Sequence, residues 1–333
     1  MKPTSSRRTF FGTAAGAAAL ACLPRRTIAQ DAYPTRPVHV IVGFTPGTAA
    51  DITARVVANG AGAALGQQIV IENKPGAGSS VAAEYVARAA NDGYTLFLPS
   101  ASIVTHQVMN PDRAFDLVRD FVPIALLASG AVVLVVNPAT NVHSIAELIA
   151  LARSKPGEVL CGNAGVGSMP HFAAELFAQR AGIKLLAVPY PGSPQAITDL
   201  VAGRTMMMFS PASTVIGQIA SGKLRALATA AEKRAPALPD VPSMSEAGMP
   251  DFDGSLWFGL SAPAGTTQAA IEKIAGAARN AVHSPEAVET LRKQGFDPIG
   301  EGPDAFGRFV RSEVERWSEV ARVAGMKSWS RFR

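Results

Sequence analysis

The stretch VHVIVGFTPGTAAD, residues 38–51, decides the fold. Its first part, Val38–Val42, is a short apolar run that predicts a buried strand. A loop containing glycine and proline follows, and an alanine-rich segment from Ala49 to about Leu65 then predicts a helix. A strand that passes through a tight loop into a helix is the repeating unit of α/β proteins.

The same alternation continues along the chain. After residues 38–65, strands are expected at 68–72, 94–98, 131–136, 159–161, 185–188, 206–209 and 256–261, and helices at 79–90, 144–154, 171–181, 194–202, 267–282, 285–294 and 304–324. Strands separated by helices predict mostly parallel sheets covered on both faces. In such sheets ligands bind at the carboxyl ends of strands, where loops lead into helices.

The first 29 residues have the pattern of a secretory leader. Arg7-Arg8 is followed by Phe10-Phe11, an uncharged stretch runs from Gly12 to Leu23, and Thr27-Ile28-Ala29 resembles a cleavage site. The paired arginines predict a twin-arginine signal. Because the apolar stretch is shorter than the ~20 residues that span a bilayer, we expect export to the periplasm and no membrane insertion after cleavage.

Removing the leader changes the charge balance. It carries five of the 31 Lys and Arg residues and no acidic residue, so 26 basic residues remain against 26 acidic ones. Nucleic-acid binding needs a concentrated basic face, and no such run is present, so no nucleic-acid partner is expected. The remaining length, about 300 residues, predicts two domains.

Three loops between a strand and a helix are candidate binding elements: residues 44–51, 162–171 and 189–194. Glycine lets backbone amides face a ligand, and the helix that follows adds partial positive charge at its N-terminus. Such a loop can hold an anion without lysine or arginine. One loop of this kind can be only a tight turn, but two in separate halves of the chain favour anion binding.

Patterns of catalysis and cofactor binding are absent from the sequence. Gly165-Val166-Gly167 lacks the third glycine of a dinucleotide fingerprint, and there is no phosphate-binding lysine loop, nucleophile elbow or zinc-protease motif. His171 and Glu175 lie four residues apart, but two groups are too few for a metal site. Cys161 is the only cysteine outside the leader and is expected to be a small buried residue. We therefore expect no enzyme activity, no cofactor and no metal.

The chain resembles the Bug-type substrate-binding proteins of tripartite tricarboxylate transporters over nearly its whole mature length. The resemblance rests on many short motifs in the same order: Pro46-Gly47 with Asp51 and Arg55, residues 72–78 (ENKPGAG), 91–96 (NDGYTL), 144–148, 165–168 with His171, 188–190 with Gly192, 238–242 (LPDVP), 246–248, and 257–260 with 262–266.

The resemblance implies two α/β domains of the type II periplasmic-binding-protein kind, hinged around a central cleft. It places domain 1 at residues 30–135 and 255–333 and domain 2 at residues 136–254. A monomer is expected, with the membrane components of a tripartite transporter as partners.

The resemblance also implies that a small di-, tri- or aromatic carboxylate is held largely by backbone amides and waters of two facing loops. The expected ligand-binding residues are Phe44, Thr45, Gly47, Thr48 and Asp51 in the first domain and Gly165, Gly167, Ser168, His171 and Tyr190 in the second, with Ser79, Ser100, Ser102 and Ser210 around the rest of the ligand. Asp51 is expected to orient loop amides, because two negative charges repel. Thr48 stands where the family usually has a second glycine, so the ligand can differ from a simple tricarboxylate.

Two alternatives stay open. A periplasmic sensor or scavenging receptor could use the same fold to signal to a membrane partner. An α/β enzyme of the cell envelope is the third possibility, because twin-arginine signals often export prefolded cofactor proteins.

Overall fold

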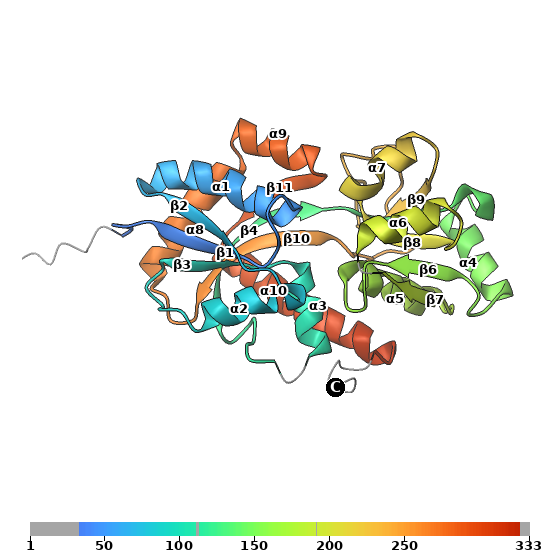
Figure 1. Cartoon of the computed structure of the whole chain (residues 1–333), viewed down its shortest axis with the longest axis horizontal. Coiled ribbons are helices and arrows are strands. Elements are labelled where there is room, and N and C mark those ends of the chain that lie inside the picture. Colours follow the sequence, from blue (N-terminus) through green and yellow to red (C-terminus); the bar gives the residue numbers. More distant parts are fainter. Residues whose placement is uncertain (1–32, 111–112, 191, 327–333) are drawn as a thin grey trace, which may run out of the picture.

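The computed structural model describes residues 33–110, 113–190 and 192–326. The chain forms two lobes, each built on one β-sheet with helices on both faces (Figure 1). The predicted α/β class with two domains is confirmed. The predicted leader, residues 1–29, lies outside the described residues.

The first lobe contains a six-stranded sheet in the order β11-β4-β10-β3-β1-β2. One face packs against α1 and α8, and the other against α2, α3 and α10. The strands are β1 (Val38–Val42), β2 (Ile69–Asn73), β3 (Thr95–Leu98), β4 (Phe121–Gly130), β10 (Leu256–Pro263) and β11 (Phe296–Glu301). The helices are α1 (Ala49–Leu65), α2 (Ser80–Ala87), α3 (Ala101–Met109), α8 (Gln268–Val282), α9 (Pro285–Lys293) and α10 (Pro303–Val323), with a short 3-10 turn, η1, at Ala77–Ser79.

The second lobe contains a five-stranded sheet in the order β7-β6-β8-β5-β9. Its inner strand β5 is buried along its whole length, because helices cover both faces of the sheet. The strands are β5 (Val132–Val136), β6 (Leu160–Asn163), β7 (Leu186–Pro189), β8 (Met207–Pro211) and β9 (Arg225–Thr229). The helices are α4 (Ile145–Ser154), α5 (Met169–Ala181), α6 (Ser193–Val201) and α7 (Ala212–Ala220), with a 3-10 turn, η2, at Pro138–Thr140.

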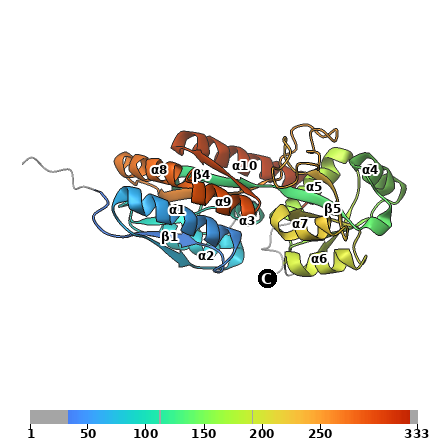
Figure 2. The same ribbon diagram turned by 90° about the horizontal axis from the view of Figure 1, so that it is seen from above.

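Two segments connect the lobes. The chain leaves the first lobe on β4, changes sheet at Ala131 and continues as β5 (Figure 2). It returns through residues 230–255 and enters β10, which pairs with β4. The predicted boundary after residue 135 lies within β5, which is a strand of the second sheet.

The sheets are mixed, which corrects the prediction of mostly parallel sheets. β1 is parallel to β2 and β3, and β6 is parallel to β7 and β8. β10 and β11 run antiparallel to β4, and β5 runs antiparallel to β8 and β9. The connections between lobes explain the difference, because a chain that leaves on β4 must return on β10 in the opposite direction.

Helix α10 packs the two lobes against each other. Trp317 is fully buried, and its ring lies 5.7 Å from the ring of Phe172 on α5, measured between centroids. The buried carboxylate of Glu313 accepts hydrogen bonds from the indole nitrogens of Trp257 (2.8 Å) and Trp317 (3.2 Å) and also pairs with Arg316. Burial raises the pKa of Glu313, although the Arg316 charge opposes this effect. The contact joins a strand of the connection, a first-lobe helix and a second-lobe helix.

Local details also agree with the sequence. Ser144 Oγ accepts the amide of Glu147 at 3.1 Å, and the Glu147 carboxylate accepts the amide of His143 at 2.7 Å, which confirms the predicted helix cap. Cys161 is buried, and burial raises the pKa of its thiol to about 12. Across the described helices, no segment is both long and apolar enough to span a bilayer.

Candidate functional site

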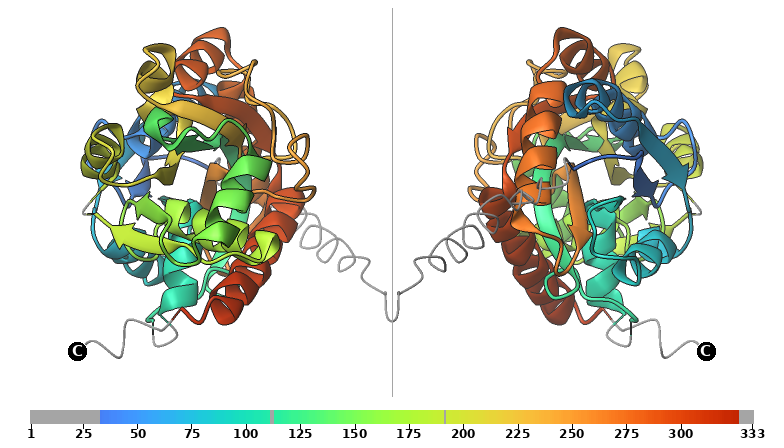
Figure 3. Two further views of the ribbon diagram at one scale, coloured as in Figure 1. Left: turned by 90° about the vertical axis from the view of Figure 1, so that its right-hand side faces the viewer. Right: turned by 90° about the vertical axis from the view of Figure 1, so that its left-hand side faces the viewer.

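A cavity of about 640 Å³ opens between the two lobes. Its walls are loops that follow strands, together with the helix α3 that follows β3. The first lobe contributes Phe44, Ala77, Gly78, Ser102, His106 and Asn110, and the second contributes Ala164, Val166, Gly167 and Ser168. We call this cavity the cleft. The end-on views show the two lobes one behind the other (Figure 3).

The first wall of the cleft contains the loop between β1 and α1. Gly47 has a φ of 80°, a left-handed conformation that favours glycine, and its amide donates to Asp51 Oδ2 at 2.9 Å. Thr48 is the N-cap of α1 and its hydroxyl donates to the Thr45 carbonyl at 2.9 Å. These bonds fix the loop at the positive end of a 17-residue helix.

Asp51 holds this loop from behind. Asp51 is only 2 % exposed, and besides the Gly47 amide its carboxylate accepts from Arg55 Nε at 3.0 Å and Asn73 Nδ2 at 2.9 Å. Asn73 Nδ2 also donates to the Phe44 carbonyl at 2.9 Å. Burial alone would raise the pKa of Asp51, but the hydrogen bonds from Arg55, Gly47 and Asn73 outweigh it and lower the pKa. Asp51 is therefore ionised at neutral pH, with its charge already compensated by its own neighbours.

The second wall contains a matching loop between β6 and α5. Gly167 has a φ of 79°, and its amide donates to His171 Nδ1 at 3.2 Å. The amide of the N-cap residue Ser168 donates to the Gly165 carbonyl at 3.1 Å. Because Nδ1 accepts a hydrogen bond, the imidazole proton of neutral His171 lies on Nε2, which is 3.6 Å from the Glu175 carboxylate. His171 has the place in this loop that Asp51 has in the first.

Three serine hydroxyls near the cleft are buried and make no hydrogen bond within the described part of the chain: Ser79, Ser100 and Ser168. Ser79 also has a φ of 80°, and it follows Ala77 and Gly78, which have φ values of 44° and 62°. Left-handed residues other than glycine are strained, and such strain concentrates at binding sites. Buried polar groups normally have a partner, so these hydroxyls indicate a place for a polar ligand or water.

The predicted ligand-binding residues fall into three groups. Phe44, Ser102, Gly167 and Ser168 line the cleft. Thr45, Gly47, Thr48, Asp51, Gly165 and His171 form or support the two loops, and Ser79 and Ser100 are buried outside the lining. Tyr190 instead donates its hydroxyl to Asp199 at 2.8 Å, and the fully buried Ser210 shares a 2.9 Å hydrogen bond with Thr214.

Six lining residues were not predicted: Ala77, Gly78, His106, Asn110, Ala164 and Val166. Ala77 and Gly78 belong to the ENKPGAG motif, and Ala164 and Val166 belong to the predicted second loop, so the sequence carried a signal for these four. His106 and Asn110 lie on and just after α3, a helix that the sequence pattern did not predict.

The cleft lining contains no lysine or arginine among the described residues. The N-termini of α1 and α5, which follow the two loops, carry partial positive charge, because their first amides have no carbonyl partner within their own helix. The described residues also contain no group of three or more His, Cys, Asp or Glu side chains that could hold a metal ion. The cleft is suited to bind a small anion through backbone amides and hydroxyls.

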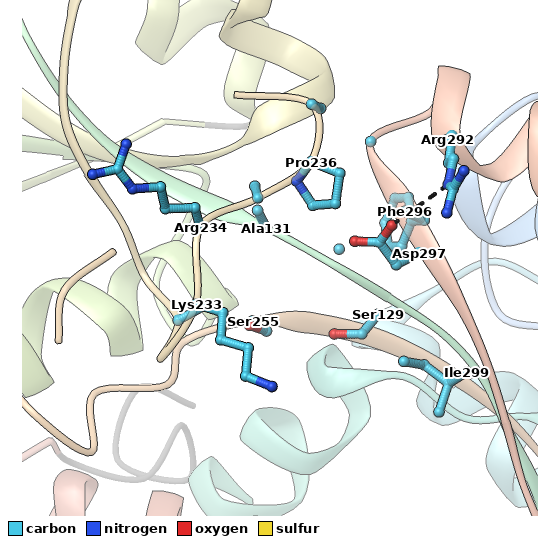
Figure 4. Close-up of a pocket in the computed structure, with 15 residues that line it drawn as sticks. Ser129, Ala131, Lys233, Arg234, Pro236, Ser255, Arg292, Phe296, Asp297 and Ile299 are labelled. Carbon is cyan, nitrogen blue, oxygen red and sulfur yellow. Dashed lines mark ion pairs between the residues drawn. The ribbon is translucent and has the colours of Figure 1, made fainter. Parts of the chain in front are cut away.

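A second hollow, of about 400 Å³, lies beside the segments that connect the lobes (Figure 4). We call it the hinge pocket. Lys233 and Pro236 line it from the second lobe, Arg292 and Asp297 from the first, and Ala131 and Ser255 from the connections. In the first sheet, the connecting strands β4 and β10 lie between β11, which lines the hinge pocket, and β3, β1 and β2, which lead to the cleft. In the second sheet, β5 lies between β9, which leads to the hinge pocket, and β6, which leads to the cleft.

Three comparisons place this architecture among known proteins. Residues 53–326 match the model of a family described as tripartite tricarboxylate transporter family receptor. The chain is 36 % identical to protein BugT of Bordetella pertussis over 90 % of this chain and 93 % of that protein.

Two solved structures are also similar. Rpa4515 of R. palustris, solved with adipate, has a TM-score of 0.75 and 33 % identity, covering 88 % of this chain and 98 % of that one. MatC (Rpa3494) of Rhodopseudomonas palustris, with bound malate, has a TM-score of 0.72 and 31 % identity, covering 86 % of this chain and 99 % of that one.

Proposed function

The chain belongs to the tripartite tricarboxylate transporter receptor family, whose members are periplasmic solute-binding proteins and not enzymes, and from that membership we propose that it captures a small carboxylate in the cleft. The observation that carries the proposal is the pair of matched loops at residues 44–48 and 164–168. Phe44 of the first loop and Ala164, Val166, Gly167 and Ser168 of the second line the same cavity, and a helix begins directly after each loop.

The energetics fit a charged ligand of this kind. A hydrogen bond to an ionised group contributes roughly 1.5–3 kcal/mol, so three or four of them exceed the ordering costs by enough for micromolar binding. Amides at helix N-termini need no side-chain charge to bind a carboxylate. Ser168 adds a hydroxyl that has no hydrogen-bond partner among residues 33–110, 113–190 and 192–326.

We further propose that the two lobes close on the ligand and that the closed form delivers it to the membrane components of a tripartite transporter. Export by the twin-arginine signal at residues 1–29 belongs to the same proposal. Solved relatives with adipate and malate support the carboxylate class.

A thermal-shift screen of the mature protein against carboxylates tests this function. Each acid is paired with its uncharged primary amide as a control. An acid at a hundredfold excess over its Kd should raise the free energy of unfolding by about 2.7 kcal/mol, and its amide should have no effect. If no acid stabilises the protein, or the amides do so equally, carboxylate capture is wrong.

A further inference from the structure

The α3 wall of the cleft carries a polar pair that the two loops do not explain. His106 lies in the last turn of α3, and Asn110 follows the end of the helix. Asn110 Nδ2 donates to the His106 carbonyl at 2.9 Å and lies 3.3 Å from His106 Nε2. Ser80 Oγ lies 2.7 Å from His106 Nδ1. His106 and Asn110 also line the cleft.

These contacts define the protonation of the imidazole. The amide nitrogen of Asn110 can only donate, so Nε2 of His106 is the acceptor and Nδ1 carries the proton toward Ser80. Burial lowers the pKa of His106, with Glu84 opposing this effect and Arg113 adding to it. The histidine is therefore a neutral hydrogen-bonding group at neutral pH. Its acceptor nitrogen Nε2 has only long contacts among the described residues, at 3.3 Å from Asn110 Nδ2 and 3.4 Å from Ser80 Oγ.

The surroundings of this pair do not suit a second negative charge. The last turn of a helix carries partial negative charge, in contrast to the helix N-termini at the two loops. Arg113, the arginine whose charge acts on His106, already has a carboxylate partner, because it donates to Asp116 at 2.7 Å. A buried charge without a partner is strongly disfavoured, whereas a hydroxyl group can donate to an acceptor such as His106 Nε2.

We propose that the cleft selects a monocarboxylate with an apolar body and an uncharged hydroxyl group, and that His106 is the specificity-determining residue that binds this hydroxyl. The inference rests on the proposed function, because it takes the carboxylate at the two loops as given. The apolar body lies against Phe44, Ala77, Ala164 and Val166, which share the same cavity. The ligand class thereby differs from that of relatives solved with the dicarboxylates adipate and malate.

Two matched series of acids test the proposal by titration calorimetry. The chain series is hexanoate, 6-hydroxyhexanoate and adipate, and the ring series is benzoate, 4-hydroxybenzoate and terephthalate. In each series the three acids differ only in the group farthest from the first carboxylate. In at least one series we expect the hydroxy acid to bind about tenfold more tightly than its parent acid and more tightly than the dicarboxylate.

The variant His106→Leu then completes a double-mutant cycle, in which one change removes the imidazole from the protein and the other removes the hydroxyl group from the ligand. In this variant the hydroxy acid and its parent acid should bind about equally tightly. His106→Gln, which keeps a neutral hydrogen-bonding group, should retain part of the tenfold preference. His143→Leu is the matched control, because His143 is exposed and remote from the cleft lining, and it should keep the full preference.

Two results would overturn the inference while the proposed function stands: a dicarboxylate that binds most tightly in both series, or a hydroxyl preference that His106→Leu leaves unchanged. Binding of no acid at all to the unsubstituted protein would overturn both. If a thermal melt shows that His106→Leu does not fold, the preference for the hydroxy acid over its parent acid is measured with His106→Gln instead, and a preference that this variant leaves unchanged would overturn the inference.

Discussion

Gly47 and Gly167 have the same backbone conformation on opposite walls of the cleft, with φ values of 80° and 79°. Each donates its amide to the side chain four residues later, Asp51 in one case and His171 in the other. The two loops therefore have the same backbone conformation and hydrogen-bond pattern. The acceptor is the anionic carboxylate of Asp51 in the first loop and the neutral imidazole of His171 in the second. A carboxylate between them would meet two helix N-termini, and the negative charge of Asp51 behind the first loop is buried and paired with Arg55.

The left-handed conformation of Gly47 predicts how an alanine will behave there. A Cβ at this position meets nothing within 4 Å, so Gly47→Ala adds only backbone strain of about 1–2 kcal/mol. We expect lower stability and, because the strained loop turns its amides away, at least tenfold weaker carboxylate binding. Gly66→Ala is the control: Gly66 has a φ of 68° and the same empty surroundings, but it ends α1 far from the loop. Equal Kd values for the two variants in calorimetry would contradict the role of the Gly47 loop.

The second prediction concerns the acceptor on His171. Replacing it with leucine removes the partner of the Gly167 amide and should weaken carboxylate binding by about 1–2 kcal/mol, or roughly tenfold. Asparagine places an oxygen near the position of Nδ1, so His171→Asn should keep most of the affinity. Calorimetric titration of both variants makes the comparison. A large loss with asparagine would mean that His171 acts through another contact.

Acid should destabilise the protein through His106. Its pKa is lowered by burial in the folded state, whereas the unfolded chain takes up the proton near the ordinary value of about 6.5. Between that value and the lower folded pKa the unfolded state binds more protons, so this contribution to stability is lost as pH falls below about 6.5. Denaturant unfolding of the wild type and His106→Gln from pH 8 to pH 5 should show a steeper loss in the wild type. Parallel curves would contradict this contribution.

The hinge pocket offers a test of lobe closure. Because the connecting strands separate it from the cleft, rotation that narrows the cleft must widen the hinge pocket. A bulky residue in this pocket, Ala237→Phe, should favour the closed form and tighten carboxylate binding severalfold. Ala139→Phe is a control in the same lobe, because Ala139 is exposed and lies outside the pocket. Unchanged affinity and unchanged small-angle scattering in Ala237→Phe would argue against this rotation.

Elements with strong local patterns were predictable from sequence. The helix α1 begins and ends where the alanine-rich run does, and the buried run of β5 was displaced by only one residue. Among the α-helices and strands of the described residues, five were not indicated by the pattern: α3, β4, α7, β9 and β11. Pro123 interrupts β4 and Pro298 interrupts β11, and both strands pair antiparallel through irregular registers, so their pattern is weak. The mixed order of the sheets depends on contacts between distant strands, which local periodicity does not contain.

The candidate site was predictable where it depends on loop chemistry. Glycine, proline and a helix start identify the two loops from sequence alone, and the supporting role of Asp51 follows from charge repulsion. The equivalent role of His171 was not predictable, because it depends on which ring nitrogen faces the Gly167 amide. His106 and Asn110 reach the cleft only through the packing of α3, so no local motif marks them.

The shared contact of Trp257 and Trp317 with Glu313 has an optical consequence. Both indoles donate to one buried carboxylate, and the Trp317 ring touches Phe172, the neighbour of His171 on α5. Any rotation of the second lobe moves α5 against these rings and changes the electric field that they experience. The intrinsic fluorescence of the native protein should therefore change in colour or intensity as the cleft fills, which gives a label-free signal for following capture in real time.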